Sequence, residues 1–564
     1  PWIASIGPEL VSFEPDALEL PLTHSTVDAA VPIGVLPESA TGYHGRPGLV
    51  GARPDGSDWS PQFSLVAATS TEASARFELS DPIAGLELVL DVAVADVVTI
   101  RAELVNRSDT SYGVQRLAPT FPVPAHAGEL LTFAGRWCRE FQPRRVPFVG
   151  SHLVENRTGR SSQVTAPGLF VGTDAFSEQR GEVWGVQLAW SGAYVFAAEL
   201  LPDGRRVVQA GELLSPGEVV LAPGERYASP DVVVAWSPSG MTEASQRFHR
   251  YARAHRPVAG TRPVILNTWE AVNFDHDLDR LRNLADVAAD VGVERFVLDD
   301  GWFGARRDEH AGLGDWWVSE TAWPTGLAPL NDHVLALGMD FGLWVEPEMV
   351  NPDSDLYRAH PEWTLTTAGY EPLLGRYQLV LDCGRSEVRD FLFDALDSLL
   401  TDHAISYLKW DMNRDVVQGS RDLRAGLHGH TVGVYELIDR LRGAHPGVEI
   451  ESCASGGGRV DLGILRRTDR VWTSDCNDAL ERQLIQRGCS MLVPPEVMGA
   501  HIGPERAHTT GRRHDLGFRA ATALFGHLGI EWNLLDADDA QREEIAAAVA
   551  LHRRLRPLLH GGDV

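Results

Sequence analysis

A chain of 564 residues is too long for one hydrophobic core, so the sequence predicts two or three domains. Hydrophobic residues make up 44% and charged residues 23%, which is typical of a globular protein. The formal net charge of −28 argues against nucleic-acid and anionic-membrane partners, because phosphate groups repel an acidic surface.

The five cysteines form an odd set without a C-x-x-C pair, so we expect neither a disulfide framework nor a zinc site. Cysteines of this kind favour a reducing, cytoplasmic setting. No apolar run is long enough to span a bilayer, and the first residues show no signal-peptide pattern. Because the chain begins with Pro1 rather than Met, secretion of a trimmed protein stays open.

Short alternating apolar segments, separated by Gly, Pro, Asp and Asn, fill the first 240 residues. Clear examples are 85–92, 97–104 and 182–190. Many short strands with frequent turn signals predict an N-terminal β-sandwich domain over residues 1–240. A helical stretch near Thr242–His255 and a Pro/Gly-rich connection follow, and we assign residues 241–262 to a helical linker.

From residue 263 to residue 564, apolar strands alternate with helix-like segments. The predicted strands are 263–269, 295–299, 341–346, 406–411, 448–453 and 471–475, with weaker candidates at 496–501 and 525–532. Eight such units would close a (β/α)₈ TIM barrel, in which reactive side chains collect at the carboxyl ends of the strands. An open doubly wound sheet is the alternative, but the Gly-rich phosphate turn expected after its first strand is missing. The tail 544–555 reads as one amphipathic helix.

Only one of the 50 Lys and Arg residues is a lysine, Lys409, two positions before Asp411. A lysine is a compact point charge that fits a small pocket where a planar guanidinium does not. Side chains alternate along a strand, so Lys409, Asp411 and Asn413 are expected to share one face. Three polar side chains on a buried strand are costly unless they have partners or a task. The pattern predicts a pocket around Asp411.

The predicted strands end in acidic and aromatic residues. These are Asp299, Asp300, Trp302, Trp344, Glu346, Glu348, Trp410, Asp411, Glu451, Asp475 and Asp478. Carboxylates accept hydrogen bonds from hydroxyl groups, and indole faces stack on the apolar C–H patches of a sugar. The strand ends therefore indicate a neutral ligand that is rich in hydroxyl groups.

Cleavage of a glycosidic bond needs two carboxyl groups in different protonation states. Asp411 fits the ionised nucleophile, because the Lys409 ammonium on the same strand face would lower its pKa. Asp475 fits the acid/base, although spacing alone does not select it. Its rivals are Glu346, Glu451 and Asp478. A structural salt bridge with one of the many arginines is the other interpretation of any single strand-end acid.

Five sequence runs, in this order, resemble the bacterial α-galactosidases of glycoside hydrolase family 36. The runs are NTWEA (267–271), VLDDGWFG (297–304), GLWVEPEM (342–349), KWDMN (409–413) and SCASGGGR (452–459), with weaker matches at GRPGL (45–49) and GRW (135–137). The resemblance implies an N-terminal β-supersandwich and a catalytic (β/α)₈ barrel. It also implies a retaining mechanism without metal or cofactor, and a homotetramer.

By this resemblance Asp411 is the nucleophile and Asp475 the acid/base, and Asp299 and Asp300 bind the O4 and O6 hydroxyls of galactose. The other implied sugar contacts are Trp269, Trp344, Arg376, Lys409, Cys453 and the Gly456 backbone, the last two near O2. Tyr377 departs from the Asn expected in many members. The chain also ends after the last barrel helix, where the family usually continues into a C-terminal β domain, so we expect a fragment or a short form.

The leading hypothesis is a retaining exo-α-galactosidase that releases terminal α-linked galactose from melibiose- and raffinose-type sugars. An α-N-acetylgalactosaminidase is the alternative on the same fold, although Cys453 is expected to leave little room for an N-acetyl group. A plant-type galactosyl transferase is a weaker third. Other classes are a Mg²⁺-dependent enolase-type barrel enzyme, since strand-end acids can ligate metal, and a carbohydrate-binding protein without activity.

Overall fold

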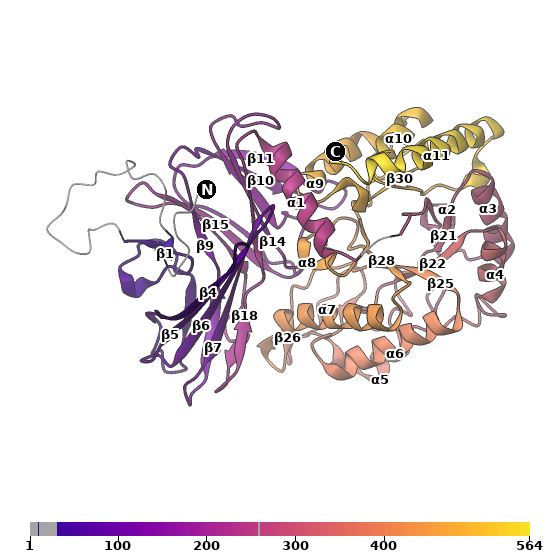
Figure 1. The fold of residues 1–564 in the computed structure, drawn as a ribbon. Coiled ribbons are helices and arrows are strands. Elements are labelled where there is room, and N and C mark those ends of the chain that lie inside the picture. The colour runs from indigo at the N-terminus through magenta and orange to yellow at the C-terminus, as the bar shows by residue number, and fades with distance from the viewer. Residues whose placement is uncertain (1–8, 11–30, 258–259, 564) are drawn as a thin grey trace.

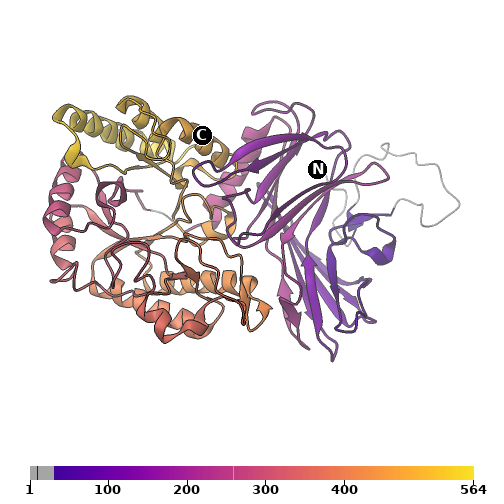
Figure 2. The same ribbon diagram turned by 180° about the vertical axis from the view of Figure 1, so that it is seen from behind.

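The computed structural model describes residues 9–10, 31–257 and 260–563. Two domains lie side by side, a β domain from the first half of the chain and a barrel with helices on its outside (Figure 1). The view from behind shows the same arrangement (Figure 2). The first eight residues and residues 258–259 of the predicted linker lie outside the described part of the chain.

Antiparallel sheets build the N-terminal domain. The largest has ten strands in the order β11-β10-β13-β14-β19-β7-β6-β5-β4, with β18 paired to β7. Smaller sheets run β12-β15-β16-β9 and β17-β8-β3. The strands are β1 (Glu9–Leu10), β2 (Ile33–Gly34), β3 (Leu49–Ala52), β4 (Ser64–Ser70), β5 (Ser74–Asp81), β6 (Leu86–Val94), β7 (Val98–Asn106), β8 (Tyr112–Leu117), β9 (Thr120–Val123), β10 (Glu129–Ala134), β11 (Gln142–Pro147), β12 (His152–Asn156), β13 (Gly168–Gly172), β14 (Val183–Leu188), β15 (Tyr194–Leu200), β16 (Arg206–Glu212), β17 (Val219–Leu221), β18 (Arg226–Ala228) and β19 (Val232–Ser237).

The two larger sheets of this domain share a hydrophobic core. Alternate residues of β6, Leu86, Leu88 and Leu90, are buried, and they belong to the same core cluster as Phe121 and Tyr194 of the smaller sheet. This period of two buries one face of β6 and leaves the other face more exposed. The predicted N-terminal sandwich is confirmed.

Helix α1 (Met241–His255) joins the two domains. Its Phe248 packs against β14 at Gly185, where a Cβ atom would come within 2.7 Å of the ring. Arg253, near the end of the helix, donates to the buried Glu496 of the barrel at 2.8 Å. The segment expected to be a linker is therefore packed against the sandwich and tied to the barrel.

The second domain is a closed barrel of parallel strands in the order β20-β21-β22-β25-β28-β29-β30-β31. The strands are β20 (Ile265–Asn267), β21 (Arg295–Leu298), β22 (Asp340–Val345), β25 (Ile405–Trp410), β28 (Glu449–Ser452), β29 (Arg470–Trp472), β30 (Met498–Ile502) and β31 (His527–Ile530). The predicted (β/α)₈ barrel is confirmed, including the two strands that the sequence marked only weakly. Each strand ends within a few residues of its predicted end.

Helices surround the barrel (Figure 1). The helices are α2 (Trp269–Val272), α3 (Leu278–Asp290), α4 (Ala328–Ala336), α5 (Asp355–Ala359), α6 (Ser386–Asp402), α7 (Leu427–Ala444), α8 (Leu462–Leu465), α9 (Ala479–Ser490), α10 (Leu516–Ala523) and α11 (Asp539–Leu559). Two small two-stranded sheets pair β23 (Met349–Val350) with β24 (Leu379–Val380) and β26 (Ser420–Arg421) with β27 (Arg424–Ala425). None of the helices in the described ranges is long and apolar enough to cross a bilayer. All five cysteines are buried, free thiols.

Two strand-end acids have structural partners inside the barrel. Glu348 accepts from Arg459 at 2.7 Å and from the Trp410 indole at 2.8 Å. Burial opposes the ionisation of Glu348, but Arg459, His430 and Trp410 together outweigh it and lower the pKa to about 2. Glu451 forms an ion pair with the fully buried Arg470. The salt-bridge interpretation therefore holds for these two acids.

Helix α7 contains two glycines that allow its packing against the barrel to be tested. Its buried residues Val434, Leu437 and Ile438 recur at helical spacing and face the barrel. A Cβ atom at Gly433 would collide with the carbonyl oxygen of Cys383, whereas one at Gly443 meets no atom within 4 Å.

We expect Gly433→Ala to lower the free energy of unfolding by about 1–3 kcal/mol through overpacking. Gly443→Ala should raise it by about 0.5–1 kcal/mol, because alanine has the higher helix propensity. Urea unfolding of the parent and both variants measures the two differences. Equal effects of the two substitutions would contradict this packing.

Candidate active site

A cavity of about 660 Å³ lies at the carboxyl ends of the barrel strands. It is lined by Trp137, Arg160 and Gln163 from the N-terminal domain and by Trp269, Glu270, Asp299, Asp300, Trp344, Leu373, Leu374, Gly375, Arg376, Lys409, Asp411, Asn413, Arg414, Asp415, Val417, Ser455, Trp472, Asp475, His508 and Glu531 from the barrel. Eight of the ten predicted site residues are in this lining; the exceptions are Cys453 and Gly456.

Asp411 directly follows β25 and is held by four hydrogen-bond donors. Its Oδ1 accepts from the backbone N–H groups of Met412 at 2.8 Å and Ser455 at 3.2 Å. Its Oδ2 accepts from the Asn413 amide at 2.8 Å and from the Trp344 indole at 3.1 Å. Hydrogen bonds of this kind stabilise the charged form of a carboxyl group.

The charge of Lys409 adds to this stabilisation, although not through a direct pair. Its Nζ lies 2.8 Å from Oδ2 of Asp299, so the ion pair of the lone lysine is with Asp299. Burial alone would raise the pKa of Asp411, but the nearby Lys409 charge and the Cys453 thiol hold it below its usual range. Asp411 is thus an ionised carboxylate at neutral pH, as a nucleophile must be.

Asp475 lies after β29 and carries an indole on each oxygen. Trp472 donates to Oδ1 at 3.0 Å, and Trp137 of the N-terminal domain donates to Oδ2 at 2.9 Å. Burial and the negative charge of Asp411 raise the pKa of Asp475 above its usual range. The pKa of Asp411 is thus lowered and that of Asp475 raised, which is the pattern expected of a nucleophile and an acid/base.

The three rivals of Asp475 do not line the cavity. Burial raises the pKa of Glu346 to about 8, and its carboxyl accepts from the Gln378 amide at 3.0 Å. Glu451 is paired with an arginine, and Asp478 caps the first turn of α9. The geometry therefore favours Asp475 for the acid/base role.

Asp299 and Asp300, at the end of β21, have different partners. Asp299 accepts from Lys409 and from the Asn267 amide at 2.7 Å. Asp300 forms a bidentate ion pair with the buried Arg306, whose Nη2 lies 2.8 Å from Oδ2. Both carboxyl groups are buried and still line the cavity, so both can accept hydrogen bonds from a ligand.

The predicted aromatic and cationic contacts also come together here. Trp344 stacks on Phe303 with 6.1 Å between ring centroids, and Trp269 meets Phe274 edge-on at 5.2 Å. Arg376 donates to Oδ1 of Asn413 at 2.8 Å. These packed and bonded neighbours fix the position of each side chain at the cavity wall.

Cys453 and Gly456 do not line the cavity but contact Asp411 and Asp475, and their part in binding near O2 stays a prediction. The Cys453 thiol is buried against Asp411. A Cβ atom at Gly456, whose φ is +79°, would collide with the backbone nitrogen of Asp475. Between them in sequence, Ser455 lines the cavity. Cys453 and Gly456 thus support the two carboxyl groups.

Several lining residues carried little or no signal in the sequence. Trp137 is 338 positions away from Asp475, a contact that only the tertiary fold creates. Arg160 and Gln163 also come from the sandwich. Trp472 lies in the predicted strand 471–475, and Glu531 lies in the weaker candidate 525–532. In the structure β29 ends at Trp472 and β31 ends just before Glu531, so both residues follow the rule that site residues collect at strand ends.

No group of three or more His, Cys, Asp and Glu side chains in the described parts of the chain is arranged to hold a metal ion. Asp299 pairs with Lys409 and Asp300 pairs with Arg306, so these two acids already have cationic partners in the place of a Mg²⁺ ion.

Comparison with known protein families agrees with this geometry. The family model named Melibiase matches residues 226–562, and the model for the glycosyl hydrolase family 36 N-terminal domain matches residues 7–222. The chain belongs to glycoside hydrolase family 36. It is therefore an enzyme of the glycoside hydrolase class.

Relatives within family 36 cover nearly the whole chain. An alpha-galactosidase of Escherichia coli is 45% identical over 99% of this chain and 80% of its own length. Alpha-galactosidase AgaA of Geobacillus stearothermophilus is 35% identical over 89% of this chain and 72% of its own. The crystal structure of alpha-galactosidase AgaB from the same organism matches with a TM-score of 0.90 at 32% identity, covering 94% of this chain and 78% of that one.

The lone lysine of this family 36 chain can be tested by a substitution that keeps its charge. Lys409→Arg should lower kcat/KM about tenfold or more, or about 1.4 kcal/mol, because a planar guanidinium displaces Asp299 and any ligand from a buried site built for an ammonium. Thermal unfolding should change little. Arg358→Lys, in an exposed ion pair, is the control. Activity near that of the parent would show that the site does not need lysine.

The hydrogen bond from Trp137 predicts a change in pH dependence. Trp137→Phe removes a donor that stabilises the ionised form of Asp475, so the pKa of Asp475 rises and the alkaline limb of kcat/KM moves to higher pH. Trp236→Phe is the control, since it removes a similar indole–carboxylate bond, 2.8 Å to Glu182, outside the cavity. An alkaline limb that stays in place would refute this role.

Proposed function

We propose that this chain is a retaining exo-α-galactosidase that releases terminal α-linked galactose from melibiose- and raffinose-type sugars. The observation that carries the proposal is one cavity with two carboxyl groups of opposite pKa shift, Asp411 below and Asp475 above the usual range. Relatives named alpha-galactosidase support it, and a variant of AgaA has been crystallised in complex with raffinose.

In the first step, a carboxylate oxygen of Asp411 attacks the anomeric carbon of galactose. The bond from that carbon to the glycosidic oxygen breaks, and Asp475 gives its proton to the departing oxygen. The product is a covalent ester between galactose and Asp411. Loss of the proton from Asp475 is favourable at this point, because Asp411 has lost the negative charge that raised the pKa.

In the second step, Asp475 acts as a base. It takes a proton from a water molecule, whose oxygen attacks the anomeric carbon from the side that the leaving group vacated. The ester bond to Asp411 breaks, and galactose leaves with its α configuration. Asp299 and Asp300 accept hydrogen bonds from galactose hydroxyls, and the Trp344 and Trp269 rings cover the apolar parts of the sugar.

Two carboxyl groups about 5–5.5 Å apart give retention, whereas inversion needs a wider gap for water. We predict the shorter separation for Asp411 and Asp475, and therefore expect hydrolysis of melibiose to yield α-galactose as the first product, followed in time-resolved NMR. Initial formation of β-galactose would overturn the mechanism. Absence of hydrolysis on melibiose, raffinose and nitrophenyl α-galactoside would overturn the function itself.

The two catalytic assignments predict different variants. Asp475→Ala should retain activity on aryl galactosides whose leaving group needs no proton, and should lose it on melibiose. Asp411→Ala should be inactive on both, because no nucleophile remains. Steady-state rates on the two substrates separate the roles, and recovery of Asp411→Ala on the aryl substrate would mean that the roles are exchanged.

Two other functions are distinguished by simple assays. An α-N-acetylgalactosaminidase would hydrolyse nitrophenyl α-N-acetylgalactosaminide in preference to the galactoside. A Mg²⁺-dependent enzyme would lose activity in EDTA, whereas the proposed mechanism uses no metal and predicts unchanged turnover.

A further inference from the structure

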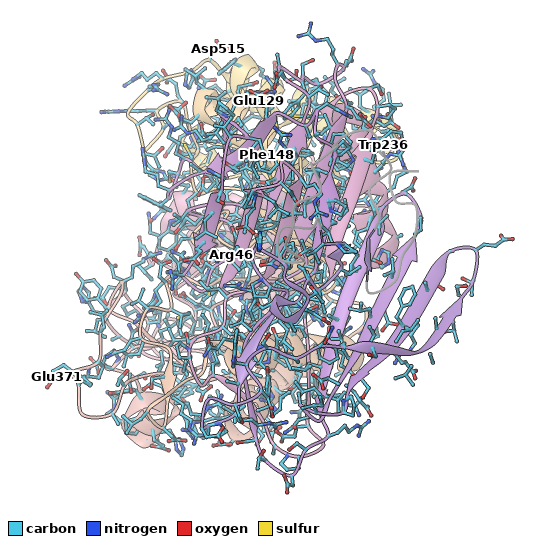
Figure 3. The ribbon with its side chains drawn as sticks, turned by 90° about the vertical axis from the view of Figure 1, so that its left-hand side faces the viewer. Arg46, Glu129, Phe148, Trp236, Glu371 and Asp515 are labelled. Atoms are coloured by element: carbon cyan, nitrogen blue, oxygen red, sulfur yellow. The ribbon has the colours of Figure 1, made fainter. Side chains whose placement is uncertain are left out.

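Exposed apolar side chains stand at the wall of the catalytic cavity. The loop between β23 and β24 carries Leu373 and Leu374, which are 54% and 49% exposed, and Val417 after β25 is 56% exposed. All three line the same cavity as the two catalytic carboxyl groups. The loop lies at the surface, where Figure 3 labels its residue Glu371 at the lower left. Exposed apolar groups that adjoin a ligand cavity mark a binding surface.

This loop is fixed to the segment that carries Val417. The backbone N–H of Leu373 donates to the side-chain carbonyl of Gln418 at 3.1 Å. Its carbonyl oxygen accepts from the Arg414 guanidinium at 2.8 Å. Both backbone groups of Leu373 are thus bonded to residues 414–418, so the leucine side chains and Val417 form one surface. We call Leu373, Leu374 and Val417 the apolar platform.

The polar side chains beside the platform already have partners. Arg160 pairs with Asp415 at 2.6 Å and donates to the Ala454 carbonyl at 3.2 Å. The Gln163 amide donates to the carbonyl of Ser455 at 3.1 Å. A ligand that reaches this end of the cavity therefore meets bonded polar groups and free apolar ones.

The platform lies on the side from which the leaving group departs. Asp475 protonates the glycosidic oxygen, so the aglycone, the part of the substrate beyond that oxygen, passes its indole partner Trp137. The turn of Trp137 is joined to the Arg160–Gln163 segment, because Gly135 donates to the carbonyl of Val164 at 2.8 Å. One wall thus runs from Trp137 past Arg160 to the platform.

We propose that the apolar platform binds the aglycone, and that the enzyme favours α-galactosides with an aryl or alkyl aglycone. The proposal rests on the proposed function and extends it to the substrate class. Apolar surface removed from water on binding stabilises the bound substrate roughly in proportion to its area, and an alkyl chain offers more such surface than the glucose of melibiose.

The test compares octyl α-galactoside with melibiose as substrates. In the triple variant Leu373→Ser/Leu374→Ser/Val417→Ser, the ratio of kcat/KM for the octyl substrate to that for melibiose should fall about tenfold. Leu484→Ser on α9 is the control, since this leucine is 50% exposed but lies outside the cavity, and its ratio should equal that of the parent. Thermal unfolding shows whether the triple variant is folded, and single serine variants replace it otherwise.

An unchanged ratio in folded variants would overturn the proposal, while hydrolysis of both substrates would leave the proposed function standing. A change in oligomeric state, with an unchanged ratio, would assign the platform to contact with a second copy of this chain. Failure of the parent to hydrolyse either substrate would overturn the proposed function and this inference with it.

Discussion

Two carboxyl groups of opposite protonation state must coexist in one cavity, and the site is arranged around this constraint. Burial alone would favour the neutral form of both. Asp411 stays ionised because the Lys409 charge, the Cys453 thiol and the other hydrogen-bond donors together outweigh burial. Its negative charge then raises the pKa of Asp475. Stabilising one carboxylate thus helps to keep its neighbour protonated.

The other acids at the strand ends support this arrangement by being neutralised. Asp300, Glu348 and Glu451 each pair with a buried arginine, and Asp299 pairs with Lys409. Within the described residues, neither Asp411 nor Asp475 has an ion-pair partner. Their protonation states therefore depend on each other and on the donors around them, and the arginine pairs hold the surrounding strand ends in place.

Much of the fold and part of the site could be predicted from the sequence, because barrel strands are apolar runs and their carboxyl ends converge. That rule placed Asp299, Asp411 and Asp475 in one cavity. The rule did not predict the contacts that a long side chain or the other domain makes. The long stem of Lys409 carries its ammonium from β25 to Asp299 at the end of β21, although strand spacing pointed to Asp411. Trp137 lies in the weak GRW match, but nothing in the sequence pointed to its contact with Asp475.

The hydrogen bond from Trp137 to Asp475 gives the N-terminal domain a part in the candidate active site. All four of these donors to Asp411 belong to the barrel, so the barrel by itself could hold the proposed nucleophile. The proposed acid/base, Asp475, differs, since the sandwich supplies one of its two indole partners and part of the cavity wall. Burial is the largest cause of the raised pKa of Asp475. Docking of the sandwich thus helps to set the acidity of Asp475, and the proposed mechanism needs both domains.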